Sequence, residues 1–200
     1  MKKWLFAVLM AVSGFVHAAI VEGKDYELLA KPQPTPAGKV EVIEFFSYHC
    51  IHCFNLEPAI AAWAKKLPKD VQFRREQIVW GQQMEPLARL FATLKTTKMM
   101  DRLHVPAITA MVQQRVNLAD EAELGKFLAA QKGVDVKAFM QVYKSFGMNA
   151  QVARASQMTR DYAIQATPTI VVGGKYVAKA AEPAQLLKVV DELIIKARGK

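Results

Sequence analysis

Apolar and polar residues alternate in short runs along the first part of the chain, and these runs predict strands. Residues Val40–Phe46 are apolar enough on both faces to form a strand that is covered on two sides. Residues 71–79 alternate apolar and polar side chains, and an apolar patch at 26–30 precedes a proline-rich loop. The pattern therefore predicts a short strand followed by two longer ones.

Helical spacing of apolar residues begins at residue 54 and continues to residue 67, where Pro68 ends the pattern. Residues 47–49 form the predicted turn before this helix, so the helix follows a strand directly. From about residue 84 to residue 165 no strand pattern occurs. Successive helices with breaks near residues 96–98, 115–119, 133 and 147 are expected there.

The last part of the chain predicts a hairpin and a helix. Thr169–Val172 and residues 175–178 flank Gly173 and Gly174, a pair suited to the positive φ values of a tight turn. Pro183 is well placed to begin the final helix.

This order of elements predicts an α/β fold with a central mixed sheet flanked by helices and an inserted helical domain. Residues 19–82 and 149–200 would form the sheet domain, and residues 83–148 the inserted helical domain.

The N-terminus has the layout of a secretory signal peptide. Lys2 and Lys3 precede an apolar run at residues 4–12 and then small residues up to Ala19, so we expect residues 1–18 to be removed by cleavage after Ala18. The alternative is a membrane anchor, but a bilayer takes roughly 20 apolar residues to span and this run is shorter. We therefore expect the protein to be exported to a bacterial periplasm, a compartment in which disulfides persist.

Charge and cysteine content narrow the function classes. The net charge is +9, but the lysines and arginines are scattered with no basic block among aromatic residues, which argues against nucleic-acid binding. The chain has two cysteines, Cys50 and Cys53. A disulfide between them would close almost no loop and add little stability, so a reactive role explains the pair better than a structural one.

The position of the cysteine pair at the start of a helix predicts its chemistry. Thiolate is the nucleophile in disulfide exchange, and free N–H groups and the helix dipole favour an anion at a helix N-terminus. Cys50 is therefore the expected attacking thiol and Cys53 the resolving one. A protonated His49 or His52 would add positive charge. Because a stabilised thiolate stabilises the reduced protein, the disulfide form becomes a stronger oxidant.

Two other uses of the Cys-x-x-Cys spacing are less well supported. Haem attachment requires histidine directly after the second cysteine, and Phe54 stands there. Structural zinc takes four ligands, whereas this chain offers one cysteine pair with His49, His52 and a remote His104. His104 lies in an apolar helical stretch and is interpreted as a packed or surface histidine.

Two further positions remain open on sequence alone. Glu44 shares a strand face with Val42 and Phe46, so it is either a covered carboxylate that relays protons to Cys53 or an edge residue that reaches solvent. Pro168 precedes a predicted strand. Its bond to Thr167 is either cis, exposing backbone groups for a peptide, or trans at the start of a strand.

Several of these segments resemble the DsbA family of periplasmic thiol:disulfide interchange proteins. Residues 42–53, the helical insertion, Thr167-Pro168 and Gly174-Lys175-Tyr176 occur in the family's order and separation, over essentially the whole chain after residue 18. The resemblance implies a thioredoxin fold with an inserted helical domain. It also implies oxidation of newly exported proteins through a mixed disulfide at Cys50.

The resemblance further assigns site residues and partners. The family's acidic residue corresponds to Glu44, its histidine to His52, and its cis-proline pair to Thr167 and Pro168. Ile51 departs from the Pro-His dipeptide that is commonest in the family. A DsbB-type membrane quinone reductase would restore the disulfide, and no cofactor beyond the redox-active Cys50–Cys53 pair is expected.

We expect residues around the cysteines to contact the substrate, namely His49, Ile51, Thr167 and Pro168. The sequence favours a monomeric oxidase and leaves two alternative functions open. One is a disulfide isomerase or reductase of the same fold, although the roughly twenty residues before the active-site strand are too few for a dimerisation domain. The other is a peptide-binding chaperone in which the cysteines are incidental.

Overall fold

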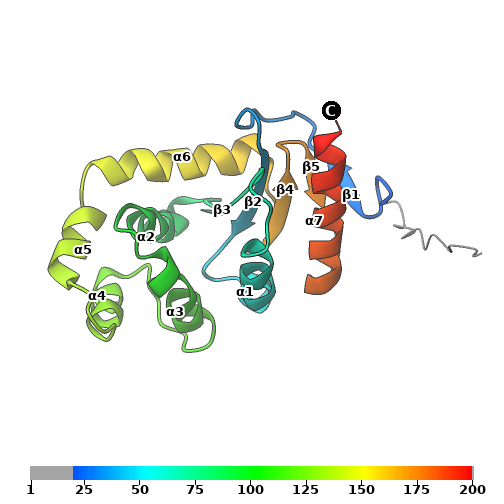
Figure 1. Cartoon of the computed structure of the whole chain (residues 1–200). Helices are drawn as coiled ribbons and strands as arrows, with labels where there is room; N and C mark the ends of the chain where they lie inside the picture. The colour runs from blue at the N-terminus through cyan, green and yellow to red at the C-terminus, as the bar shows by residue number, and fades with distance from the viewer. Residues whose placement is uncertain (1–19, 200) are drawn as a thin grey trace, which may run out of the picture.

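The computed structural model describes residues 20–199, with a five-stranded mixed sheet at its centre (Figure 1). The strands are β1 (Tyr26–Leu28), β2 (Val40–Phe46), β3 (Val71–Gln77), β4 (Thr169–Val172) and β5 (Tyr176–Ala178). Their order across the sheet is β1-β5-β4-β2-β3. β2 runs parallel to β3 and antiparallel to β4, and β5 runs antiparallel to both β4 and β1. The predicted strands and hairpin are therefore confirmed.

Helices make up most of the remaining chain. They are α1 (Ile51–Ala64), the 3₁₀ turn η1 (Gln82–Met84), α2 (Glu85–Thr96), α3 (Met100–Val112), α4 (Glu121–Ala129), α5 (Val136–Tyr143), α6 (Gly147–Asp161) and α7 (Pro183–Arg198). The helical stretch predicted between β3 and β4 is confirmed, as is the start of the last helix at Pro183. Figure 1 shows α2 to α5 gathered on one side of the sheet.

Two predicted boundaries are wrong by a few residues. α1 begins at Ile51 with Cys50 as its N-cap, so the helix opens at the cysteine pair as predicted, but its C-terminal end differs from the predicted residue 67. The helix ends at Ala64, and Lys66 N–H bonds to the Trp63 carbonyl in a tighter turn. β3 ends at Gln77, where its partner β2 also ends at Phe46. Ile78 and Val79 are nevertheless buried.

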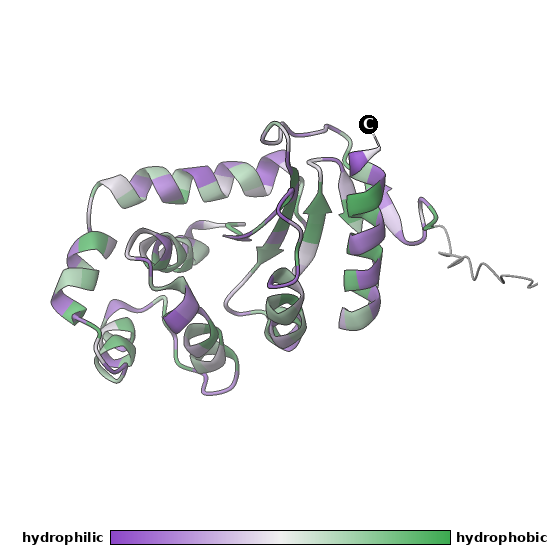
Figure 2. Cartoon of the chain, viewed as in Figure 1, coloured by the Kyte–Doolittle hydropathy of each residue, from purple (hydrophilic) through white to green (hydrophobic). Residues whose placement is uncertain are grey.

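The central strand β2 has helices on both faces. All seven of its residues are buried, as expected for a strand covered on two sides. On one face Val42 packs with residues of α1 and α7, such as Leu56 and Leu193. On the other face Phe45 packs with Tyr162 just after α6, with ring centroids 4.9 Å apart. Figure 2 shows β4 as largely apolar and β2 as apolar with polar positions between, while polar and apolar residues alternate along α6 and α7.

A third apolar cluster joins the sheet to the helical insertion. It begins at the end of β2 with Phe46 and Tyr48, includes Cys53 of α1, and continues into α2 and α3 through residues such as Leu90 and Leu103. The insertion thus packs directly against the segment that carries the cysteines. The placement of the thiols therefore depends on both parts of the molecule.

The predicted signal peptide at residues 1–18 lies outside the described residues. Within residues 20–199, no helix combines the length and the apolar character that crossing a bilayer requires. The domain boundaries given above stay a prediction.

Candidate active site

Cys50 and Cys53 lie at the N-terminus of α1, as the sequence predicts. Cys50 is the N-cap residue with an extended backbone, and its Sγ accepts a hydrogen bond from the Cys53 N–H at 3.3 Å. Its own N–H bonds to the Ser47 carbonyl at 3.0 Å, which fixes the turn from β2 into the helix. Both cysteines are free thiols, and the cap geometry directs helix N–H groups at Cys50.

The two thiols differ in exposure and in acidity. Cys50 is half-buried, whereas Cys53 is 1% exposed. A hydrogen bond from the Cys53 thiol is the main cause that lowers the pKa of Cys50 from 9.0 to about 5, and the backbone N–H groups of Cys53 and His52 act in the same direction. The same thiol–thiol bond and burial raise the pKa of Cys53. Cys50 is therefore a thiolate near neutral pH and Cys53 a thiol.

Thr167 and Pro168 lie against the cysteines although they are more than a hundred residues away in sequence. The Thr167–Pro168 peptide bond is cis. The Cys50 thiol contacts the Thr167 carbonyl oxygen at 3.2 Å. The structure thus resolves the alternative that the sequence left open and brings this loop to the reactive sulfur.

The other predicted residues around the thiols are exposed. His49, Ile51 and His52 all lie at the surface, and Ile51 is 48% exposed. The His49 N–H bonds to Ser47 Oγ at 3.3 Å, and burial lowers the pKa of the His49 ring. These side chains therefore form the rim around Cys50 and leave it accessible.

Glu44 is buried beneath α1, so its side chain lies on a covered face rather than at an edge that reaches solvent, while the proton relay to Cys53 stays a prediction. Its side chain is 1% exposed, and Arg75 Nε on the neighbouring strand lies 3.0 Å from Oε2. The two residues are direct partners in the β2–β3 register. Burial raises the pKa of Glu44 from 4.5 to about 7, the charge of Glu57 acts in the same direction, and Arg75 opposes both. The carboxyl group can therefore hold or release a proton near neutral pH.

Sequence reasoning missed the side chains that surround Glu44. Arg75 Nη2 contacts both carboxylate oxygens of Glu57 at 2.9 Å, and His104 Nε2 lies 3.3 Å from Glu57 Oε2. The Tyr48 hydroxyl lies 3.1 Å from His104 Nδ1. One signal was available, since Glu57 follows Cys53 by four residues and helical spacing places both on the same face.

His104 is a packed residue, in agreement with one of the two interpretations given above. It is 4% exposed, and its ring contacts the Phe46 ring edge-on with centroids 5.1 Å apart. Its two polar partners were not predicted, because they come from the loop before Cys50 and from α1.

A hollow of about 820 Å³ opens beside the cysteines. Its walls are α1 with His52 and Leu56, the Thr167–Pro168 loop, and residues 178–183 with Leu186. The cysteines themselves do not line the hollow, but Thr167 does, and its carbonyl oxygen contacts Cys50. A peptide segment bound there would bring its own thiol to the active site.

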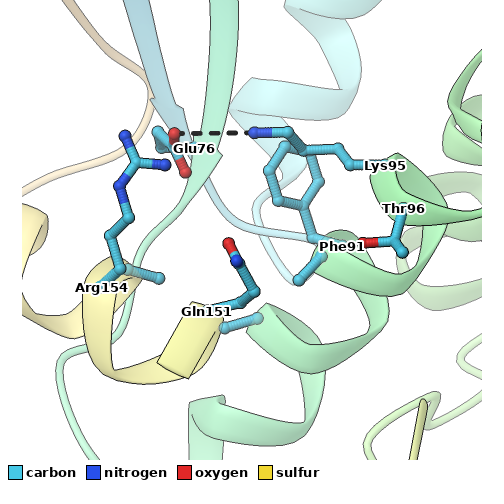
Figure 3. Close-up of a pocket in the computed structure, with 9 residues that line it drawn as sticks. Glu76, Phe91, Lys95, Thr96, Gln151 and Arg154 are labelled. Carbon is cyan, nitrogen blue, oxygen red and sulfur yellow. Dashed lines mark ion pairs between the residues drawn. The ribbon is translucent and has the colours of Figure 1, made fainter. Parts of the chain in front are cut away.

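A smaller cavity of about 230 Å³ lies elsewhere, between α2, α6 and the end of β3 (Figure 3). Glu76 and Lys95 form an ion pair at 3.8 Å on its wall, and Gln151 and Arg154 approach from α6. Neither cysteine lines this cavity. Within residues 20–199, no group of three or more His, Cys, Asp or Glu side chains could hold a metal ion.

Comparisons with known proteins agree with this geometry. A family model described as thioredoxin matches residues 35–192. The thiol:disulfide interchange protein DsbA of Burkholderia cepacia is 38% identical over 88% of this chain and 86% of its own length. DsbA of Pseudomonas aeruginosa is 36% identical over 98% of this chain and 96% of its own length.

Solved structures give the same result. The oxidoreductase DsbA1 of Neisseria meningitidis superimposes with a TM-score of 0.85 at 36% identity, covering 92% of this chain and 96% of that one. The crystal structure of Pseudomonas aeruginosa DsbA gives a TM-score of 0.84 at 36% identity, covering 90% and 95%. The predicted thioredoxin fold with a helical insertion is confirmed. The chain belongs to the thioredoxin family and, within it, to the DsbA thiol:disulfide interchange enzymes.

Proposed function

We propose that the disulfide form of this protein oxidises pairs of thiols in newly exported proteins through a mixed disulfide at Cys50. The main support is the contrast between the two thiols. Cys50 is accessible and its pKa is lowered to about 5, whereas Cys53 is buried and its pKa is raised. A low thiol pKa makes Cys50 a good leaving group and stabilises the reduced protein.

The reaction proceeds in two exchange steps. A substrate thiolate attacks Cys50 Sγ, the Cys50–Cys53 bond breaks, and Cys53 leaves with the electron pair and takes up a proton. A second substrate thiolate then attacks the substrate sulfur of the mixed disulfide and releases Cys50 as a thiolate. The substrate dithiol loses two electrons, and the protein gains them as two reduced cysteines.

Glu44 is the proposed source of the proton that Cys53 needs. A buried thiolate at Cys53 is unfavourable, because burial and the neighbouring thiol both raise its pKa. The pKa of Glu44 is raised to about 7, and the charge of Glu44 acts on Cys53. A carboxyl group that titrates near the working pH is suited to proton transfer.

Substrate binding is assigned to the hollow beside the cysteines and to the exposed rim. Thr167 and Pro168 line the hollow, and the Thr167 carbonyl already contacts Cys50. Ile51 offers an apolar side chain and His49 a polar one next to the thiol. The hollow and its rim would accept an extended, partly apolar peptide of variable sequence, as expected for unfolded clients.

The setting of the reaction follows from the N-terminal sequence and the family. Cleavage after Ala18 would release a monomeric protein into the periplasm, where it meets exported chains before they fold. A DsbB-type membrane quinone reductase would restore the disulfide by exchange at Cys50. No bound cofactor is required, since the Cys50–Cys53 pair carries the electrons.

The redox equilibrium of the Cys50–Cys53 pair in glutathione buffers tests the proposal. Purified protein lacking residues 1–18 is equilibrated and its thiols are read by alkylation. A potential well above that of thioredoxin-type reductants is expected despite Ile51, because the cap geometry stabilises the Cys50 thiolate. A strongly reducing potential would contradict the oxidase assignment and favour a reductase.

Two single variants provide the matched test of mechanism. Cys50→Ser removes the attacked sulfur and is expected to abolish oxidation of a dithiol peptide. Cys53→Ser leaves Cys50 but removes the resolving thiol, so a mixed disulfide between Cys50 and an activated substrate should accumulate. Binding of unfolded protein that prevents its aggregation equally well in Cys50→Ser, with no dithiol oxidation by the unmodified protein, would instead indicate a chaperone.

A further inference from the structure

His104 connects the helical insertion to both sides of the active site. It lies on α3 and is 4% exposed. Its Nδ1 is 3.1 Å from the hydroxyl of Tyr48, two residues before Cys50, and its Nε2 is 3.3 Å from Oε2 of Glu57 on α1. Among residues 20–199 Nε2 makes no contact with full hydrogen-bond geometry, so the 3.3 Å approach to Glu57 is the polar contact open to it.

These contacts determine where the ring proton of His104 lies. Burial raises the pKa of Tyr48, so the phenol stays protonated. Its O–H group can therefore donate a hydrogen bond to Nδ1 of His104. Burial also lowers the pKa of His104, which favours the neutral ring. A neutral ring that accepts at Nδ1 carries its proton on Nε2, directed at the Glu57 carboxylate.

The two buried carboxylates next to this histidine have unequal sets of donors. Arg75 Nη2 contacts both oxygens of Glu57 at 2.9 Å, and His104 adds a third contact. Glu44 receives the Arg75 Nε contact at 3.0 Å as its one ion pair among the described residues. Glu57 is thus the better supported anion.

One arginine opposing two buried carboxylates leaves one negative charge uncompensated. A single proton neutralises the cluster. Glu44 and Glu57 share this proton unless a neighbouring group favours its binding to one of the two carboxylates. The titratable and charged groups that face this cluster come from β2, the loop before α1, α1, β3 and α3. They are Glu44, Tyr48, Cys50, Cys53, Glu57, Arg75 and His104.

We propose that His104 is a positioning residue that assigns this proton to Glu44, because its Nε2 approaches Glu57 at 3.3 Å and favours the ionised form of that carboxylate beside Arg75. The inference deepens the proposed function, because a proton on Glu44 is available to Cys53 whereas one on Glu57 would not be. It also gives the helical insertion a direct part in the exchange reaction, since His104 belongs to the insertion.

Replacement of His104 by phenylalanine tests the assignment. His104→Phe keeps an aromatic ring against Phe46 but removes the donor to Glu57, so the proton moves to Glu57 and the full charge of Arg75 then acts on Glu44. The titration midpoint of Glu44 should fall by about one pH unit, a typical effect of a neighbouring opposite charge. The readout is the ¹³C chemical shift of the Glu44 carboxyl carbon in the reduced protein as a function of pH.

The conservative variant His104→Gln separates positioning from packing. Its amide retains an N–H donor toward Glu57 and an oxygen that accepts from Tyr48, so Glu44 should titrate near its original midpoint. A second test does not depend on the folding of His104→Phe. The shorter variant His104→Asn lacks the reach to Glu57 and should show the same downward shift. Circular dichroism confirms that each variant is folded.

The pH profile of dithiol oxidation gives an independent readout. The pH above which the rate falls should move downward in His104→Phe by the same amount as the Glu44 midpoint, and return in His104→Gln. Unchanged Glu44 titration in folded His104→Phe and His104→Asn would overturn the inference. Loss of the proposed function has a different signature, since it would appear as absent dithiol oxidation in the unmodified protein.

Discussion

At the scale of single residues, the site depends on placing ionisable groups in unequal surroundings. Cys50 and Cys53 are three positions apart, yet the hydrogen bond between their thiols lowers the pKa of Cys50 and raises that of Cys53; helix N–H groups reinforce the first shift and burial the second. Glu44 is held beneath α1 by a strand register that pairs it with Arg75. Burying a carboxylate with a shared counter-ion weakens the folded state, and this penalty depends on pH.

Glu44→Gln should remove that pH dependence. The pKa of Glu44 is about 7 in the folded protein, above its ordinary value of 4.5. Its contribution to stability is therefore complete below pH 4.5 and is lost as the pH rises through 7. The loss is on the order of 3 kcal/mol and is absent in Glu44→Gln, so the variant gains stability relative to the unmodified protein between about pH 4 and pH 8.

Urea unfolding of the disulfide forms measures this difference without a contribution from the free thiols. Glu123 provides the control, since its carboxylate is partly exposed and pairs with Lys126 on the surface of α4. Glu123→Gln is the matched removal of one carboxylate that is not buried. If the free energies of unfolding of Glu44→Gln and the unmodified protein differ by the same amount at about pH 4 and about pH 8, Glu44 does not titrate as described.

At the scale of elements, the β4–β5 hairpin holds the Thr167–Pro168 loop against the cysteines. β4 begins directly after Pro168 and pairs with β2, which leads into the cysteine loop. Gly173 and Gly174 both have positive φ values, as the sequence predicts for this turn. Gly174 also carries a tertiary contact, because its carbonyl accepts a hydrogen bond from Gln33 N–H at 2.8 Å.

Gly174→Ala should be distinctly more destabilising than Gly38→Ala. Both glycines have left-handed backbones, with φ of +61° and +70°, and alanine there costs about 1 kcal/mol. A Cβ at Gly38 meets open space, whereas a Cβ at Gly174 would lie 2.2 Å from the Gln33 carbonyl oxygen. We expect Gly174→Ala to cost more than about 2 kcal/mol in urea unfolding. Equal losses of unfolding free energy in the two variants would mean that residues 31–35 do not pack closely against the turn.

At the scale of the whole molecule, the redox state of the cysteines and the stability of the fold are linked. Cys53 and Tyr48 belong to the apolar cluster that continues into the helical insertion. A thiolate at Cys50 therefore interacts with a site built from both parts of the molecule. Any preference of the folded protein for this thiolate adds to the stability of the reduced form.

The stability advantage of the reduced form over the disulfide form should increase between pH 5 and pH 9. The pKa of Cys50 is about 5 in the folded protein and 9.0 ordinarily, so its contribution is fully present above pH 9 and is lost as the pH falls through 5. Above pH 9 the advantage should decline, because the raised pKa of Cys53 keeps that thiol protonated in the folded state alone. The measurement is the free energy of unfolding of the reduced and disulfide forms as a function of pH. A difference between the two forms that does not change with pH would contradict a stabilised thiolate.

Much of this protein is determined by relations between neighbours in the sequence. The strand patterns, the breaks between helices, the Gly173–Gly174 turn and the start of a helix at the cysteine pair were all predicted, because backbone preference and side-chain periodicity are local properties. The same holds for the unequal roles of Cys50 and Cys53, which follow from the position of each along one helical turn. The errors were boundaries, namely the C-terminal ends of α1 and β3, which the structure places at Ala64 and Gln77.

Tertiary structure alone decided what surrounds the thiols. The Thr167 carbonyl reaches Cys50 across 117 positions in sequence, and His104 reaches Tyr48 across 56. Glu44 could be predicted to lie on a covered face, but its partner Arg75 depends on the register of a parallel strand pair. The sequence by itself thus determined the reactive groups and the elements that carry them. Which groups share a proton with them required the fold, because hydrogen bonds and charge pairs act over a few ångströms of space whatever the separation along the chain.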